Sequence, residues 1–567
     1  MIERFFKTLG HEISGLHEAA YLLGIFALFA KILALFRDRL LAHNFGASET
    51  LDIYYAAFRI PDFIYISLAS LVASAVLIPF VVSKLPADGA VGETGERARQ
   101  FFNSIFTVFF IGIIGVSVLV FFLLPFLSPL IVPGLSPEAQ SQLVLLSRIM
   151  LLSPILLGLS GLFASITQAL RRFFVYALGP VLYNLGIIVG ILFFYPQWGL
   201  AGLAYGVVLG ALFHVFIQIP VLVRQNFFPR FSFRIRFADI KDVMSLSLPR
   251  TLTLSASHFV LLIFISFASL MGEGAISIFN FSFNLQSVPL SIIGVSYSVA
   301  AFPTLARMIS IGARGEFVGQ VLSSLRHIIF WSFPIMVLFI VLRAQIVRVV
   351  LGTGEFGWPE TRLTAAALAL FSVSVFAQSV ILLLVRGYYA AGKTKAPLVI
   401  NVFSSIFIIG LALALIEIFS ASEFFRYFVE SLFRISFVEG TAIIMLPLAF
   451  SLGTLVNVFV LWHFFRKEFG IEKAALGEVL RHSFYGATVM GFVSYQLLGV
   501  FDNVFDINTF WGIFLQGFLS GIIGIAAGII LLKLLGNKEM SEVSTALHHK
   551  FWKSKPVAPD QGDLVSN

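Results

Sequence analysis

The sequence predicts an all-α polytopic membrane protein with about 14 transmembrane helices, arranged as two pseudo-symmetric six-helix lobes followed by two C-terminal helices. Three observations lead to this fold class. Hydrophobic residues make up 58% of the 567 residues, and charged residues only 12%, about half the charge of an average soluble protein. Long apolar segments recur from end to end. Two of these segments contain short motifs that recur, with some of the same residues, in the second half of the chain.

Fourteen segments are long and apolar enough to cross a bilayer, which needs about 20 mostly apolar residues. They are 19–36, 52–83, 101–129, 139–170, 173–194, 199–223, 243–271, 275–303, 318–342, 363–385, 397–416, 441–465, 475–500 and 509–532. The fourth and fifth segments are divided only by Arg171 and Arg172. We treat them as two helices because a single helix would be far too long.

An internal repeat relates the two halves. GPVLYN at 179–184 is answered by APLVIN at 396–401, so a proline and an asparagine recur at the same places of the two motifs. LGALFHVF at 209–216 is answered by LGTLVNVF at 452–459. The two motifs are farther apart in the second half than in the first, which indicates an insertion in the second copy, and 416–441 is charged and aromatic. Duplicated helix bundles around a central site are a design of membrane transporters.

The repeat and the hydropathy divide the chain into five parts. These are an N-lobe at 1–225, a linker at 226–241, a C-lobe at 242–470, two further helices at 471–535 and a polar tail at 536–567. Aromatic and basic residues alternate in the linker, a pattern typical of a segment that lies on the membrane surface.

Lysine and arginine residues predict the orientation. With the N-terminus inside, 25 of the 38 Lys and Arg residues fall in cytoplasmic segments and 7 in outer loops, so both termini are expected in the cytoplasm. This asymmetry explains the net charge of +8 without a nucleic-acid partner. The chain has no cysteine, which excludes disulfides, thiolate metal sites and cysteine nucleophiles.

Charged residues inside the apolar segments are the candidate functional residues, because intramembrane charges are costly and usually face a pathway. In the second segment Asp52, Tyr55, Arg59 and Asp62 share one helical face. We interpret this face as the wall of a hydrophilic cavity. The alternative is an internal Asp–Arg–Asp network that holds two helices together.

Lys31 and Asp38 share a face of the first segment, with Arg37 beside them, and we place them in the same cavity. Arg148, about ten residues into the fourth segment, suits either the cavity or an ion pair between packed helices. Arg250 opens a polar face of the seventh segment.

In the eighth segment Asn280 and Asn284 lead a neutral polar face that corresponds to the charged face of the second segment. Most of the charge therefore comes from the N-lobe. Its basic groups predict an anionic substrate, because arginine side chains match phosphate oxygens. An amphiphile with a phosphorylated head group fits both the charges and the apolar surfaces between helices. The sequence has neither a P-loop nor an HExxH motif, so we expect no built-in ATPase, no enzyme activity, no metal and no cofactor.

Residues 31–63, KILALFRDRLLAHNFGASETLDIYYAAFRIPDF, resemble the opening signature of the MurJ (MviN) lipid II flippases. This family belongs to the multidrug/oligosaccharidyl-lipid/polysaccharide exporter superfamily. Further matches are VPGLSPEAQ at 132–140, the stretch from RIMLLSP to VLYN at 148–184, and RGYYAAGKTKAP at 386–397. The resemblance covers about 20–535 and implies two six-helix lobes plus two extra helices.

The resemblance also implies site residues. Arg37, Asp38 and Asp52 coincide with charged positions of the family's central cavity. Lys31 stands where the family usually has arginine, and Arg59 stands where a basic residue is common.

Two departures from the family pattern concern the C-lobe. Asn284 stands at the family's cavity arginine, and Phe264 stands at an acidic position that is associated with sodium in some members. We therefore expect Arg250 to supply the missing positive charge. The departure at Phe264 argues against a sodium site, while coupling to another ion or to the membrane potential stays open.

The leading interpretation is a flippase that moves an undecaprenyl-pyrophosphate-linked peptidoglycan precursor across the plasma membrane by alternating access of two lobes. The alternatives are a flippase for another lipid-linked oligosaccharide, a drug exporter, a membrane scaffold and a polyprenyl-phosphate enzyme. The expected partners are the lipid-linked precursor, membrane lipids and wall-synthesis proteins.

Overall fold

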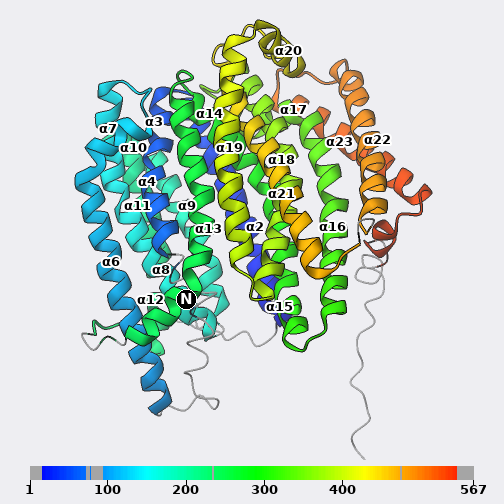
Figure 1. Ribbon diagram of the computed structural model, residues 1–567. Helices are drawn as coiled ribbons and strands as arrows, with labels where there is room; N and C mark the ends of the chain where they lie inside the picture. The colour runs from blue at the N-terminus through cyan, green and yellow to red at the C-terminus, as the bar shows by residue number, and fades with distance from the viewer. Residues whose placement is uncertain are drawn as a thin grey trace, which may run out of the picture.

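The computed structural model describes residues 16–69, 93–170, 172–232, 237–472 and 475–543, together with 71, 77, 235 and 545. Within these residues the regular structure is helical. The long helices run side by side in one bundle, with α20 at its upper end and α12 and α15 at its lower end (Figure 1). "Upper" and "lower" refer to these two ends below.

The N-lobe begins with α2, which runs through the middle of the bundle (Figure 1). Its elements are α2 (Leu16–Phe45), α3 (Glu49–Ala57), α4 (Arg59–Ile64), η1 (Tyr65–Ala69), α6 (Glu93–Ile131), α7 (Pro137–Met150), α8 (Leu152–Ala169), α9 (Phe173–Val189), η3 (Gly190–Phe194), α10 (Tyr195–Trp198), α11 (Leu200–Phe216) and α12 (Ile219–Arg224).

The C-lobe and the last two helices follow the linker. Their elements are α13 (Phe237–Ser269), α14 (Ala275–Leu290), η4 (Ser291–Val295), α15 (Ser296–Ser310), α16 (Arg314–Val341), α17 (Arg343–Leu351), α18 (Trp358–Ala390), α19 (Lys395–Ala421), α20 (Glu423–Phe433), η5 (Thr441–Ile444), α21 (Met445–Phe469), α22 (Gly477–Asp502) and α23 (Phe510–Leu534).

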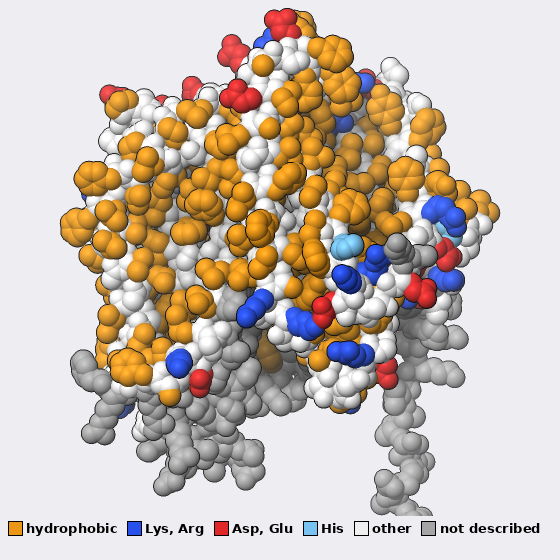
Figure 2. Space-filling model, viewed as in Figure 1, with side chains coloured by type: hydrophobic (Ala, Val, Ile, Leu, Met, Phe, Trp, Pro, Cys, Tyr) orange, Lys and Arg blue, Asp and Glu red, His pale blue; other side chains and the backbone are white. Residues whose placement is uncertain are grey.

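Twelve helices in the described part of the chain are long and apolar enough to cross a membrane. They coincide with the last twelve predicted segments. The first predicted segment lies within α2, and the second begins in α3, α4 and η1 and continues into residues that are not described. Apolar side chains cover most of the visible face of the bundle, and most Lys and Arg side chains on this face lie toward the lower end (Figure 2). The predicted all-α, multi-span fold class is confirmed.

The buried apolar core joins the two lobes most extensively at the upper end. At the upper end, Leu41 of α2, Tyr54 of α3, Phe264 of α13 and Phe281 of α14 belong to one continuous core. In the lower half, Val243 of α13 belongs to the N-lobe core, while the other C-lobe helices have a separate core. The lobes are therefore held together at the upper end, and at the lower end α13 alone shares the N-lobe core.

The sequence did not predict the π-helical turns. The second helix of each lobe contains one, η1 in the N-lobe and η4 in the C-lobe. A proline lies a few residues before each turn, Pro61 and Pro289, and proline removes a backbone hydrogen bond from the helical ladder. The two π-helical turns begin shortly after Arg59 in the N-lobe and after Ser287 in the C-lobe.

Candidate functional site

One face of α14 forms the contact between the lobes. Ser277, Asn280, Asn284 and Ser287 follow one another at spacings of three, four and three residues, which places them on a single helical face. Each of the four side chains is hydrogen-bonded to an N-lobe side chain. We call these four residues and their N-lobe partners Asp52, Arg59, Asp38 and Lys31 the polar seam.

Asp52 forms the uppermost contact of the polar seam. Its carboxylate accepts hydrogen bonds from the backbone N–H groups of Gly274 (2.8 Å) and Ser277 (2.7 Å) and from the Ser277 hydroxyl (2.6 Å). The Asp52 side chain is buried. A carboxylate at a helix N-terminus satisfies free N–H groups and complements the helix dipole. Asp52 of α3 therefore acts as a cap for α14 of the opposite lobe.

Arg59 forms the next contact down. Its guanidinium group donates to the Asn280 side-chain oxygen, while its Nε is buried without a hydrogen-bond partner. Asp62 lies one turn further along, but the two residues form no ion pair within the described part of the chain. The alternative Asp–Arg–Asp network is thus not formed by direct contact. Arg59 keeps an unused donor at the lobe boundary.

Asp38 forms the centre of the polar seam and is ion-paired with the neighbouring Arg37. Arg37 donates twice to Asp38 Oδ1, at 3.0 and 2.7 Å, and once to Asn184 Oδ1 of α9, at 3.1 Å. The other oxygen of Asp38 accepts from Asn284 Nδ2 at 3.1 Å. A neutral asparagine of the C-lobe thus contacts the carboxylate of an N-lobe ion pair.

Lys31 forms the lowest contact, donating to the Ser287 hydroxyl at 3.2 Å. Below this level the hydroxyls of the same stripe bond to carbonyls of their own helix. Ser291 contacts Ser287 O at 2.7 Å, and Ser298 contacts Val295 O at 3.0 Å. The hydrogen bonds of this stripe to the N-lobe end at Lys31, in agreement with the separate cores of the lower half.

Backbone contacts close the upper end. Gly274, at φ +79°, packs against the Ala47 carbonyl so closely that a side chain there would collide with it. The Glu49 N–H donates to Glu273 Oε1 at 3.2 Å, and the Glu355 N–H donates to His43 O at 3.1 Å. Each of these contacts joins an N-lobe segment to a C-lobe segment. These contacts therefore close the upper end of the polar seam.

Other predicted residues lie elsewhere. Arg148 donates from Nε to the Phe121 carbonyl at 3.2 Å and covers the Phe121 ring, so it packs α7 against α6 away from the polar seam. The side chain of Arg250 lies outside the described residues, and its role stays a prediction. Phe264 is fully buried among aromatic rings that include Phe279 and Phe450.

Sequence reasoning missed Ser277 and Asn184 as partners of the charged residues. Asn184 carried a signal, because it is the repeated asparagine of GPVLYN, but nothing in the sequence linked it to Arg37. Ser277 lies one turn before Asn280 on the same face, and extending the stripe upward would have included it.

The polar seam and the adjacent Arg37 suit an anionic ligand. Lys31, Arg37 and Arg59 of the N-lobe each donate to a neutral oxygen, and only Arg37 is also paired with a carboxylate. A phosphate oxygen forms a stronger, charge-assisted hydrogen bond than an amide or hydroxyl oxygen does. The three cations can therefore exchange their neutral partners for a phosphorylated head group at the lobe boundary.

Comparisons with known proteins agree with this architecture. The family model for the lipid II flippase MurJ matches residues 41–516. A relative from Thermotoga maritima, named a probable lipid II flippase MurJ, is 28% identical over 494 residues, which cover 82% of this chain and 98% of the relative. A solved structure described as lipid II flippase MurJ in an inward closed conformation has a TM-score of 0.69 at 21% identity, covering 93% of this chain and 99% of that one.

The fold is shared more widely. An inward-facing multidrug resistance transporter of the MATE family, in the MOP superfamily, has a TM-score of 0.61 at 13% identity, covering 78% of this chain and 94% of that one. The similarity to this transporter concerns the fold alone. The family model spans most of the chain, including the charged residues of the polar seam from Asp52 onward. The chain is a multi-pass membrane protein that belongs to the lipid II flippase MurJ family.

Proposed function

We propose that this protein moves lipid II, an undecaprenyl-pyrophosphate-linked peptidoglycan precursor, from the inner to the outer leaflet by alternating access of its two lobes. Family membership supports the substrate class. The polar seam is the observation that carries the mechanism. It places two basic side chains of the N-lobe, Lys31 and Arg59, against neutral partners on α14 of the C-lobe, at the boundary that must open.

In the proposed cycle the pyrophosphate enters from the lower end, where the C-lobe helices other than α13 have a core separate from that of the N-lobe. Its oxygens replace Asn280 and Ser287 as acceptors for Arg59 and Lys31. A charged head group entering a low-dielectric site needs compensating charge, since uncompensated burial costs several kcal/mol per ion. Losing these inter-lobe hydrogen bonds weakens the polar seam. The lobes then separate at the upper end and close at the lower end, as in other repeat-built transporters.

The proposed site consists of Lys31, Arg37, Asp38, Arg59 and Asn284. Asp52 acts in the same cycle through its cap on α14, and Arg250 remains the proposed extra cation.

The direct test compares Arg59→Gln with Arg148→Gln. Both variants remove one arginine from the membrane part of the N-lobe, but only Arg59 contacts α14. We expect Arg59→Gln to lower lipid II flipping in proteoliposomes at least about tenfold, the loss of one charge-assisted contact, and to fail in complementing a lipid II flippase-depleted strain. Arg148→Gln should retain both activities. Equal activity of the two variants at equal protein level contradicts the proposed site.

We also propose that the protein lies in the plasma membrane with its lower end and both termini in the cytoplasm. Because the chain has no cysteine, single cysteines report sidedness directly. Tyr427→Cys on α20 and Arg314→Cys at the start of α16 are both at exposed positions. An impermeant thiol reagent should label the first and spare the second in intact cells. The reverse pattern contradicts the orientation.

A further inference from the structure

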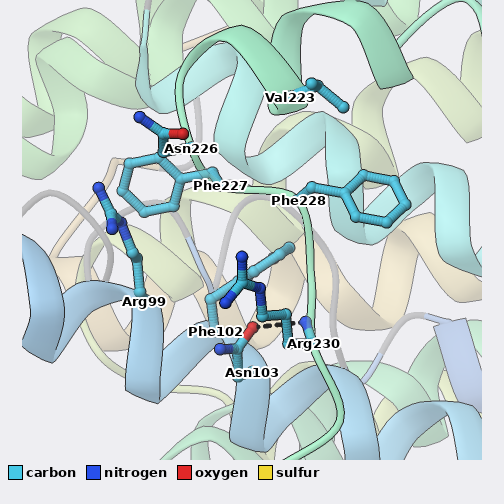
Figure 3. Close-up of a pocket in the computed structure, with 8 residues that line it drawn as sticks. All are labelled: Arg99, Phe102, Asn103, Val223, Asn226, Phe227, Phe228 and Arg230. Carbon is cyan, nitrogen blue, oxygen red and sulfur yellow. Dashed lines mark hydrogen bonds between the residues drawn. The ribbon is translucent and has the colours of Figure 1, made fainter.

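A polar hollow of about 370 Å³ lies at the lower end of the N-lobe, apart from the polar seam. It is formed by α6 and by the segment that leads from α12 into the linker (Figure 3). The residues important here are Arg99 and Asn103 of α6 and Asn226, Phe227, Phe228 and Arg230 of the segment.

The hollow is preformed, because three successive contacts hold the segment on α6. The Arg230 N–H donates to Asn103 Oδ1 at 2.9 Å, and the Ser232 N–H donates to Thr107 Oγ1 at 3.0 Å. Between them the Phe231 ring packs on Phe106, with ring centroids 5.3 Å apart. A preformed site avoids the entropy cost of ordering a loop when a ligand binds.

The charges in the hollow are all positive. Arg99 and Arg230 line it together with the two asparagines, and no acidic residue is among its described lining residues. Figure 3 shows both guanidinium groups on the same side of the segment, with that of Arg99 next to the Phe227 ring. Arg99 Nε is buried without a hydrogen-bond partner, and the Phe227 ring lies 5.8 Å from the Arg99 guanidinium carbon. The hollow therefore presents unused donors and uncompensated positive charge.

We propose that this hollow binds the phosphate group of an anionic membrane phospholipid. Guanidinium groups match phosphate oxygens in geometry and charge. Large apolar side chains stand exposed beside the hollow, namely Val223, Phe228 and Phe231. They suit acyl chains and would serve no purpose for a soluble phosphate. In the orientation proposed above, the hollow lies at the inner leaflet, where basic pockets attract anionic head groups.

The hollow lies where a lipid can act on the connection between the lobes. The segment continues through the linker into α13, whose lower part packs on the N-lobe. Ser247 Oγ donates to Leu71 O at 2.7 Å, and the hydroxyls of Ser255 and Ser67 are 3.1 Å apart. A lipid bound at Arg99 and Arg230 would hold the start of this connection on the N-lobe.

The test is native mass spectrometry of the purified full chain titrated with phosphatidylglycerol. The pocket variant carries Arg99→Gln and Arg230→Gln. The control variant carries Arg307→Gln and Arg314→Gln, which remove the same charge from exposed positions at the lower end of the C-lobe. We expect the pocket variant to bind phosphatidylglycerol about tenfold more weakly than the parent chain and to retain one lipid fewer. The control variant should bind like the parent chain.

Two further ligands, phosphatidylcholine and inorganic phosphate, test whether the site binds an anionic lipid or phosphate alone. Phosphatidylcholine and inorganic phosphate should each bind at least about tenfold more weakly than phosphatidylglycerol. Equal phosphatidylglycerol binding by the pocket and control variants would overturn the site, and equal binding of inorganic phosphate would overturn the lipid as ligand. If the double variant does not fold, Arg230→Gln alone decides, because Arg230 is held on α6 through its backbone N–H and its side chain is exposed.

Discussion

The two lobes keep the same repeated asparagine but use it differently. Asn184 of the N-lobe accepts a hydrogen bond from Arg37 at 3.1 Å, next to the polar seam. Asn401, its counterpart in the second copy of the repeat, accepts from Asn457 at 2.9 Å and stays within the C-lobe. The repeated position therefore serves the charged site in one copy and helix packing in the other.

The partner residue explains the divergence. His214 stands at the repeat position of Asn457, yet it contacts the Ser160 hydroxyl at 2.5 Å. Because His214 contacts α8, it does not pair with Asn184 as Asn457 pairs with Asn401, and Asn184 Oδ1 accepts from Arg37 instead. The repeated asparagines thus differ in role where their partners on the neighbouring helices differ.

Helix packing diverges at the same interface. In the N-lobe a Cβ atom on Gly190 would lie 2.5 Å from the Cα of Gly206, so the backbones at the start of η3 and in α11 are in direct contact. The alignment that pairs Asn184 with Asn401 also pairs Gly190 with Phe407. In the C-lobe Phe407 lines an apolar groove of about 610 Å³ between α19 and α21. The N-lobe interface is closed, while the C-lobe interface is open to an apolar environment.

The largest predicted effect comes from exchanging these packing residues. Gly190→Phe should destabilise the N-lobe by about 3 kcal/mol or more, because the ring has no space between the two backbones. Phe407→Gly should have a much smaller effect, since the Phe407 ring faces the groove. The measurement is the yield of monodisperse protein and its thermal unfolding midpoint. Similar losses for both variants would show that the two interfaces are packed alike.

The second prediction concerns the repeated asparagines. Asn184→Leu should reduce flipping about tenfold, the effect expected of losing one hydrogen bond to a charged group, with little change in unfolding temperature. Asn401→Leu should do the opposite, because it leaves the buried Asn457 amide unpaired at a cost of about 1–3 kcal/mol. Flipping and thermal unfolding are measured on the same preparations. Parallel losses in both properties for both variants would remove the functional difference between the lobes.

A smaller effect is expected at the cap of α14. Asp52→Ala removes the acceptor for three hydrogen bonds and should destabilise the upper contact by about 1–2 kcal/mol. Asp52→Asn should retain most of the stability, because asparagine is also a good helix cap. Hydrogen exchange at the first turn of α14 reports the difference. Unchanged protection in Asp52→Ala would show that the cap contributes little to closing the upper end.

The fold class followed from the sequence because apolar length and repeated polar positions do not depend on how the helices meet. The division of the fourth and fifth segments at Arg171 and Arg172 was also correct, since α8 ends at Ala169 and α9 begins at Phe173. The partners of the charged residues depend on tertiary packing. Asp38 and Asn284 are 246 residues apart, and no local pattern predicts that they touch.

The role of Asp52 shows the same limit. Its position on the charged face of the second segment predicted a cavity wall, while the structure places it over the N-terminus of α14. A helix start in the other lobe cannot be assigned to a capping residue from spacing alone. The short α17 and α20 were likewise not among the predicted segments, because they are too short to cross a membrane.

The central claim is that transport requires the sealed upper end to open. Glu49 and Glu273 are exposed neighbours across this seal, with the Glu49 N–H 3.2 Å from Glu273 Oε1. Glu49→Cys with Glu273→Cys can be joined by a short, reducible thiol cross-linker in a chain that has no other cysteine. The matched control joins Lys393→Cys with Glu468→Cys, an ion-paired couple within the C-lobe.

Lipid II flipping in proteoliposomes is then measured before linking, after linking and after reduction. Linking across the upper end should stop flipping, reduction should restore it, and the C-lobe link should have no effect. Flipping at the unlinked rate by fully cross-linked Glu49–Glu273 protein would contradict the account.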